Sequence, residues 1–337
     1  MEINLKTQKQ PRRSSLELLR IICMIFIVAH HFGVHGKYGD MQMSTFNSFI
    51  VYLLSAGGKL GVNVYVLISG YFLVNSKFNL RRIINTVGLT VFYSMTIYLA
   101  FACFMPDFGF SLYEFVRSML VVKHNAYWFV TCYVAMVLLS PFINKLLHAL
   151  DRREHLILIA LLVAMQVSIP HFGTYIGFSN VGWFITLYVI AGYMRLHPEK
   201  LLESKRVTGI ASLILCAVVG LWETATTLTS IICLLASVVL FAFFNNLPIG
   251  TNRIINLISK ATFGVYLIHD NIIVREYIWD DLLRCPMHAG YDSFWIFSAL
   301  AVIAVYVGCT LIELLRQVLT RVVLNLADSL ISKRKSA

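Results

Sequence analysis

Long apolar segments follow one another along almost the whole chain, and this feature limits its fold more than any other. Of the 337 residues, 58% are hydrophobic and only 13% are charged, and the mean hydropathy is +0.74. A helix needs roughly 20 mostly apolar residues to cross about 30 Å of hydrocarbon. The chain supplies such segments repeatedly and leaves no room for a second, soluble domain. We therefore expect one all-α integral membrane domain over residues 1–337.

The apolar segments predict a polytopic bundle of about ten transmembrane helices. They cover residues 16–36, 45–74, 83–104, 127–147, 155–170, 180–196, 207–222, 226–245, 258–279 and 293–315. We expect the second helix to break near Gly57 and Gly58, because two adjacent glycines weaken a helix. Residues 111–122 are shorter and carry Glu114 and Arg117 among apolar residues, which is typical of an amphipathic helix in the membrane interface.

The distribution of Lys and Arg between the loops predicts the orientation. With the N terminus inside, the cytoplasmic side receives 21 of these residues and the opposite side six. Loops rich in Lys and Arg stay cytoplasmic, so we expect both termini there, with residues 1–15 and 316–337 as cytoplasmic tails. The net charge of +11 is then mostly a topology signal, and it does not point to nucleic-acid binding.

The first predicted helix carries ionisable side chains at both ends, and each needs a reason because such groups are costly in a bilayer. At 100° and 1.5 Å per residue, Arg20 and His31 lie on nearly the same helix face about 16 Å apart. His30 points about 80° away, as expected of a polar residue at the outer interface. Histidine accepts protons near neutral pH, so His31 is a candidate base. Alternatively, Arg20 reaches the headgroups and His31 is simply a polar helix end.

Two arginines and a serine interrupt the next apolar segments. Arg81 and Arg82 stand at the expected cytoplasmic edge, either as positive-inside anchors or as a phosphate-binding pair, for which guanidinium groups are well suited. Ser69 lies beside Gly70 in the second helix. It favours close helix packing, although its hydroxyl could also donate a hydrogen bond near a site.

Other polar positions give weaker signals. Trp128 opens the fourth predicted helix, where an aromatic belt residue is expected. His269 and Asp270 end the ninth, and such a pair is more often a hydrated interfacial feature than a site.

The sequence also disfavours two kinds of site. We expect no metal site, because His30 and His31 are adjacent in sequence rather than one helical turn apart. A serine hydrolase is disfavoured because the GxSxG motif is missing.

Four segments, in order, resemble landmarks of the membrane-bound acyltransferase-3 family. They are Arg20 and His31 separated by ten residues and followed by Phe32; LISGYFLV at 67–74 with LRRIINT at 80–86; YWFVTCYVAMVLLSP at 127–141; and FGVYLIHDN at 263–271. The resemblance runs along most of the chain. Many members carry a carboxylate in the fourth-helix motif, where this chain has Thr131, Cys132 and Tyr133, so no acid/base role is carried over to that position.

The resemblance implies transfer of an acyl group, usually acetyl from cytoplasmic acetyl-CoA, to sugars of a surface polysaccharide or lipid-linked glycan in a bacterial plasma membrane. Acetyl-CoA would be a substrate, and no bound cofactor is expected. His31 and Arg20 correspond to the family's catalytic pair, and Arg81 and Arg82 would hold the donor's phosphates. His31 could act as general base or carry the acyl group as a nucleophile.

The same resemblance leaves supporting positions open. Glu17 lies within helical reach of Arg20 and either orients its guanidinium or forms a plain surface pair. Ser69, Trp128 and His269 are further candidates for supporting roles.

A transporter or flippase of a polysaccharide precursor is the main alternative function. Such proteins commonly contain internal repeats with interrupted helices in matching positions. No convincing repeat relates residues 1–170 to 171–337, and the polar residues concentrate in the first 130. A membrane protein without chemistry would leave the alignment of Arg20 and His31 unexplained. The sequence therefore favours an enzyme.

Overall fold

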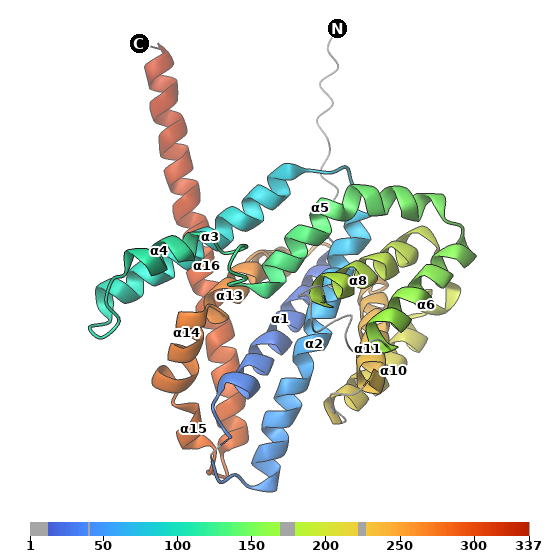
Figure 1. Cartoon of the computed structure of the whole chain (residues 1–337), viewed down its shortest axis with the longest axis horizontal. Coiled ribbons are helices and arrows are strands. Elements are labelled where there is room, and N and C mark those ends of the chain that lie inside the picture. Colours follow the sequence, from blue (N-terminus) through green and yellow to red (C-terminus); the bar gives the residue numbers. More distant parts are fainter. Residues whose placement is uncertain (1–12, 40, 169–178, 222–226, 337) are drawn as a thin grey trace.

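The computed structural model describes residues 13–39, 41–168, 179–221 and 227–336, and these ranges form helices and short connections without a strand (Figure 1). The helices are α1 (Ser14–His35), α2 (Thr45–Leu73), α3 (Leu80–Phe104), α4 (Leu112–Met119), α5 (Trp128–Ala149), α6 (Arg152–Ser168), α8 (Ser179–Leu196), α9 (Lys200–Glu203), α10 (Lys205–Leu221), α11 (Thr227–Asn245), α12 (Arg253–Ser259), α13 (Thr262–His269), α14 (Ile272–Glu276), the π-helix η1 (Tyr277–Leu282), α15 (Cys285–His288) and α16 (Phe294–Ser336). The predicted all-α class is confirmed.

Several helices are long and apolar enough to cross a membrane. Within the described ranges, α1, α2, α3, α5 and the Phe294–Leu326 part of α16 meet this requirement, and Val181–Leu196 and Ser230–Asn246 form shorter apolar helices. The first eight predicted spans each coincide with a helix, although residues 169–170, 222 and 226 lie outside the described residues, as do 1–12 of the expected N-terminal tail. The chain is a membrane protein, while ten spans and their orientation remain predictions.

The ninth predicted span, 258–279, is wrong as one continuous helix. It is divided into α12, α13, α14 and η1. Asp270 ends α13, and the Asn271 side chain starts α14 by accepting a hydrogen bond from the Ile273 N–H at 3.0 Å. Hydropathy does not detect such capping, in which an Asn oxygen satisfies an otherwise unpaired backbone donor. The break leaves His269 and Asp270 at a helix end inside the protein.

The predicted break near Gly57 and Gly58 is also wrong, because α2 runs through both residues without interruption. These glycines serve close packing against α1. A Cβ on Gly58 would lie 2.3 Å from Cγ of His30, and one on Gly61 would lie 2.8 Å from the backbone oxygen of Cys23. Small residues of this kind let two helix backbones approach each other. The α1–α2 contact therefore holds the histidine-bearing helix in place.

Replacing Gly61 by Ala should destabilise the protein, whereas Gly88→Ala should not. A Cβ at Gly61 meets backbone, but one at Gly88 meets nothing within 4 Å. Overpacking costs about 1–3 kcal/mol, while Ala in an open helix position gains up to about 1 kcal/mol over Gly. We expect a lower thermal unfolding midpoint for Gly61→Ala in detergent and an equal or higher one for Gly88→Ala. Equal shifts of the thermal midpoint for both variants would show that the close contact between α1 and α2 at Gly61 does not determine stability.

Helix α1 lies at the centre of the bundle and packs against α2, α11, α12, α13 and α16 (Figure 1).

Two predicted helices differ in length from the observed ones. Glu114 and Arg117 of the short α4 pair at 3.3 Å, and α4 has no buried residue, so the predicted 111–122 helix exists in shortened form. Helix α16 does not end at 315 as expected. It continues to Ser336 and projects beyond the rest of the bundle (Figure 1).

Candidate active site

His31 of α1 and His269 of α13 meet in the interior of the bundle. Their ring nitrogens, His31 Nδ1 and His269 Nε2, lie 2.9 Å apart, and the second ring nitrogen of His269 lies 2.6 Å from the Val265 carbonyl oxygen. His269 has no exposed surface, and His31 is 9% exposed. The two residues are 238 positions apart in sequence, so only the folded chain brings them together.

The hydrogen bonds determine which nitrogen of each ring carries a proton. A carbonyl oxygen only accepts, so His269 Nδ1 must be the donor to Val265. In a neutral ring, His269 Nε2 then has a free lone pair and accepts from His31 Nδ1–H. His31 Nε2 is consequently the unprotonated nitrogen. This arrangement orients one lone pair of His31 in the manner needed by a base or a nucleophile.

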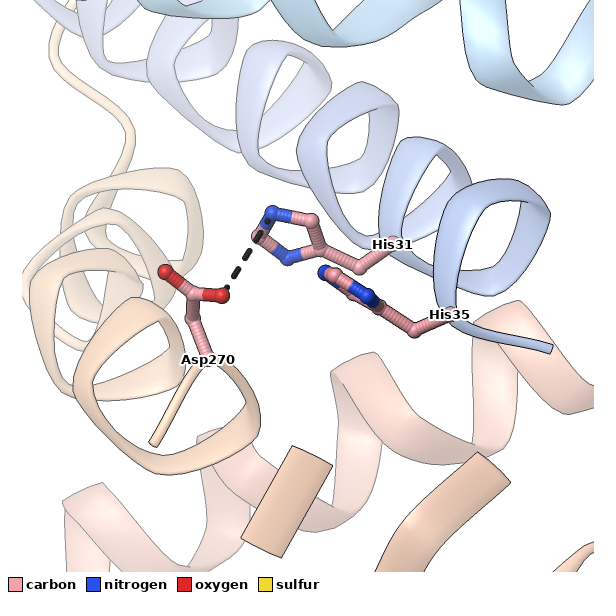
Figure 2. Close-up of side chains that lie close together, drawn as sticks. All are labelled: His31, His35 and Asp270. Atoms are coloured by element: carbon pink, nitrogen blue, oxygen red, sulfur yellow. Dashed lines mark ion pairs between the residues drawn. The ribbon is translucent and has the colours of Figure 1, made fainter. Parts of the chain in front are cut away.

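Asp270 faces that nitrogen. Its Oδ1 atom lies 3.6 Å from His31 Nε2 (Figure 2). The same oxygen lies 3.4 Å from the Arg275 guanidinium. Asp270 is 6% exposed. The carboxylate is therefore close enough to stabilise positive charge on His31, while Arg275 partly offsets its own charge. His35, one turn after His31, lies beside the same group with its ring centroid 5.3 Å from that of His31.

Neutral hydrogen bonds hold the α13–α14 break in position. The Tyr127 hydroxyl donates to the Leu267 carbonyl oxygen at 2.9 Å and accepts from the Asn271 side-chain amide at 2.7 Å. Tyr127 is almost fully buried. It therefore ties the start of α5 to the helix end that carries His269 and Asp270.

A salt bridge also links the loop after α1 to the π-helix. Lys37 Nζ lies 2.5 Å from Asp280 Oδ2, and this carboxylate raises the pKa of Lys37 above its ordinary value. Both side chains are well exposed. The pair joins the end of the helix carrying His31 to the segment that follows Asp270 and Arg275.

Arg20 lies at the opposite end of α1 from His31 and is held by Glu17. The guanidinium donates to both carboxylate oxygens of Glu17, at 3.0 and 3.1 Å, and Glu17 also accepts a hydrogen bond from Ser259 of α12. Glu17 is only 8% exposed. Glu17 is thus bonded to both α1 and α12, and a role in orienting Arg20 stays a prediction.

Arg82 and Arg20 approach the same tyrosine from two helices. Both lie within electrostatic range of the Tyr133 hydroxyl, whereas Arg81 is exposed at the start of α3. The Ser69 hydroxyl donates to the Tyr65 carbonyl oxygen at 2.9 Å and interacts with Tyr133, so it belongs to this group and not to the histidines.

An open pocket of about 520 Å³ lies near the ends of α2 and α5. It is lined by Val74, Asn75, Ser76, Lys77, Asn144, Lys145 and His148. The side chain of Asn144 accepts a hydrogen bond from Tyr188 at 2.6 Å, and Tyr188 is in electrostatic range of Arg82. The pocket is therefore connected through Asn144 and Tyr188 to Arg82, which lies near Tyr133.

Among the described residues, the remaining sequence candidates make no hydrogen bond to the histidine pair, although the His30 ring centroid lies 5.5 Å from that of His31. His30 Nδ1 lies 2.5 Å from the Ser55 carbonyl oxygen, and its ring fills the space above Gly58. Trp128 is half-buried and packs edge-on against Phe184. Neither contacts His31 Nε2 through a hydrogen bond among the described residues.

One expectation about this region is wrong. His269 and Asp270 were expected to be a hydrated interfacial pair, but both are buried. His35 and Tyr127 were not predicted as site residues. The signal that was available for His35 is its spacing, since residues four apart share a helix face.

The described ranges form an apolar helical bundle that buries an oriented histidine, and comparison with known proteins places the chain in a family. The profile of the acyltransferase-3 family, described as an acyltransferase domain, matches residues 13–313, and the chain belongs to this family. No curated protein and no solved structure gave a match.

Proposed function

We propose that this protein transfers an acyl group, acetyl from cytoplasmic acetyl-CoA, to a hydroxyl of a cell-surface or exported glycan. The observation that carries the proposal is the orientation of His31, whose Nδ1 faces His269 and whose Nε2 faces Asp270. Membership of an acyltransferase family supports acyl transfer in general. The donor, the acceptor and a bacterial plasma membrane location are part of the proposal.

In this mechanism His31 Nε2 is the general base. It takes the proton of the acceptor hydroxyl as the oxygen attacks the acyl carbonyl, the new C–O bond forms, and the C–S bond of the thioester breaks to release the CoA thiolate. Asp270, 3.6 Å from Nε2, stabilises the imidazolium that forms. The imidazolium then returns its proton to the leaving thiolate. Alternatively, Nε2 attacks the thioester itself and carries the acyl group to the acceptor.

The donor would enter from the side that carries Arg20, Arg81 and Arg82. Arg20 is about 16 Å from His31 along α1, a length that the extended pantetheine arm of CoA can span. Guanidinium groups bind phosphates through paired hydrogen bonds. Glu17 and Ser259 would hold Arg20 in one orientation for this purpose. The acyl end then reaches the histidines while the nucleotide stays at the cytoplasmic mouth.

Replacing Arg82 by Ala should raise the KM for acetyl-CoA about tenfold with little change in kcat. The lost phosphate contact is worth roughly 1.5 kcal/mol. Arg82 is half-buried beside Tyr133 and Tyr188, so its loss should exceed that of the exposed Arg81. Initial rates at varied acetyl-CoA measure the effect, with the exposed Arg153→Ala as control. An unchanged KM in both Arg81→Ala and Arg82→Ala would remove these residues from the donor site.

The function can be tested by following release of the CoA thiol. Purified protein in lipid vesicles is mixed with acetyl-CoA and an acceptor glycan, and free thiol is measured with a chromogenic reagent. We expect release that depends on both the protein and the acceptor. Succinyl-CoA in a parallel reaction tests the identity of the acyl group. Release that is independent of the acceptor would indicate thioester hydrolysis and would contradict transfer to a glycan.

A further inference from the structure

Three side chains next to the His31–His269 pair converge on one point. One ligand atom from each of His31, His35 and Asp270 lies within 4.8 Å of the other two (Figure 2). His31 and His35 are one helical turn apart on α1, the spacing by which two histidines on one helix bind a common metal ion. The expectation of no metal site considered only His30 and His31 and overlooked this pair.

The donor atoms are also in a suitable chemical state. His31 Nε2 is the unprotonated nitrogen, since Nδ1 donates to His269. Metal-binding histidines commonly donate their other ring N–H in this way, which fixes the ring and makes the free nitrogen more basic. No hydrogen bond involves the His35 ring among the residues that the structure describes, so its nitrogens are available.

We propose that His31, His35 and Asp270 form a binding site for a transition-metal cation of the Zn²⁺ type, and that occupation of this site inhibits the enzyme. Two imidazoles and a carboxylate are a ligand set that Zn²⁺ accepts, with a fourth position left for water. To reach Zn–ligand distances of about 2.0–2.2 Å, each donor atom must move inward by roughly 1 Å or less. Side-chain rotation of His35 and Asp270 provides this movement.

The charges around the site affect its affinity for metal. Asp270 attracts a cation, whereas the Arg275 guanidinium, 3.4 Å from Asp270, competes for the same carboxylate. His30, on the same helix, instead faces the Ser55 carbonyl oxygen and does not compete for the ion. The positive charge of Arg275 beside Asp270 opposes a cation there, so the site should bind reversibly and more weakly than a structural zinc site.

The inhibition rests on the proposed function. A metal ion at His31 Nε2 occupies the lone pair that would accept the proton of the acceptor hydroxyl. The ring then cannot act as a base or as a nucleophile. Metal binding and acyl transfer should therefore exclude one another at this nitrogen.

The binding test uses purified full-length protein and Zn²⁺ alone in isothermal titration calorimetry. We expect one ion per chain, with affinity lowered at least tenfold in both His35→Ala and Asp270→Asn and unchanged in His124→Ala, a matched removal of an exposed histidine elsewhere. Thermal unfolding of each variant verifies its fold, and His35→Gln replaces His35→Ala if the latter is unstable. Wild-type affinity in both His35 and Asp270 variants would overturn the site. This readout does not depend on acyl transfer.

The inhibition test measures acyl transfer against Zn²⁺ concentration, relative to each variant's own rate without metal. The concentration for half inhibition should rise at least tenfold in His35→Ala and stay constant in His124→Ala. Equal inhibition of both variants, or continued transfer by wild-type protein saturated with Zn²⁺, would overturn the inhibitory role. The calorimetric measurement of Zn²⁺ binding does not need acyl transfer. Loss of Zn²⁺ binding would therefore refute the metal site, whereas absence of acyl transfer would refute the proposed function.

Discussion

Replacing His31 by Ala is expected to lower the rate of acyl transfer on the order of 10³-fold, within the range for loss of a general base. His31 Nε2 is the unprotonated nitrogen that faces Asp270, and His269 holds the ring in that orientation. The KM for acetyl-CoA should change little, because the donor's phosphates bind at the other end of α1. Steady-state kinetics in lipid vesicles at matched protein amounts measure both quantities.

His30→Ala is the matched control for this prediction. The two histidines are adjacent in sequence, but His30 faces the Ser55 carbonyl oxygen and packs on Gly58. Its loss should reduce stability by about 1 kcal/mol through the missing hydrogen bond and leave the transfer rate within about threefold of wild type. A His31→Ala rate within tenfold of wild type, or equal losses in the two variants, would contradict the assignment of His31 as base or nucleophile.

Replacing His269 by Leu should lower kcat on the order of 10²-fold without raising the KM for acetyl-CoA. His269 is a positioning residue, since its Nε2 accepts the His31 Nδ1–H and fixes the tautomer that leaves Nε2 free. Without it, His31 can move its proton to Nε2, and the fraction of rings able to act as a base falls. The separation of kcat from KM distinguishes this role from general unfolding.

Rescue by a conservative variant provides the control. In His269→Gln the side-chain carbonyl oxygen can accept a hydrogen bond from His31 Nδ1–H. We therefore expect the kcat of His269→Gln to be at least tenfold higher than that of His269→Leu. Both variants keep a buried side chain of moderate size, and their thermal midpoints should be similar. If the Gln and Leu variants have equal kcat, the hydrogen bond between the histidines does not position His31 for catalysis.

The sequence predicted the helical class and the positions of most helices, because apolar segments are a strong and local signal. Breaks inside apolar segments were less predictable. The α13–α14 break depends on Asn271 accepting the Ile273 N–H. His269, Asp270 and Asn271 are three polar residues in a row, but hydropathy averaged over the flanking apolar residues still predicts one span. Conversely, Gly57 and Gly58 indicated a break where α2 is continuous, since glycine also permits close helix contact, and sequence alone does not separate the two roles.

The candidate site was only partly predictable for a similar reason. The periodicity of α1 singled out Arg20 and His31, because both lie on one helix and its geometry is known in advance. The partner of His31 is 238 residues away on α13, and no spacing rule connects these positions. Burial likewise depends on packing between distant helices, so His269 and Asp270 could not be distinguished by pattern from a hydrated helix end.

The most direct test of the account is transfer of radiolabel from acetyl-labelled acetyl-CoA to glycan in membranes that contain the wild-type chain or His31→Ala. We predict label in the glycan with wild-type protein, released by mild alkali as expected for an ester, and no label above background with His31→Ala. No label with acetyl-CoA or other acyl-CoA donors in the presence of a suitable acceptor would contradict the account. A transporter or flippase would then become the leading interpretation, with the Arg20–His31 face as part of a gate or proton path.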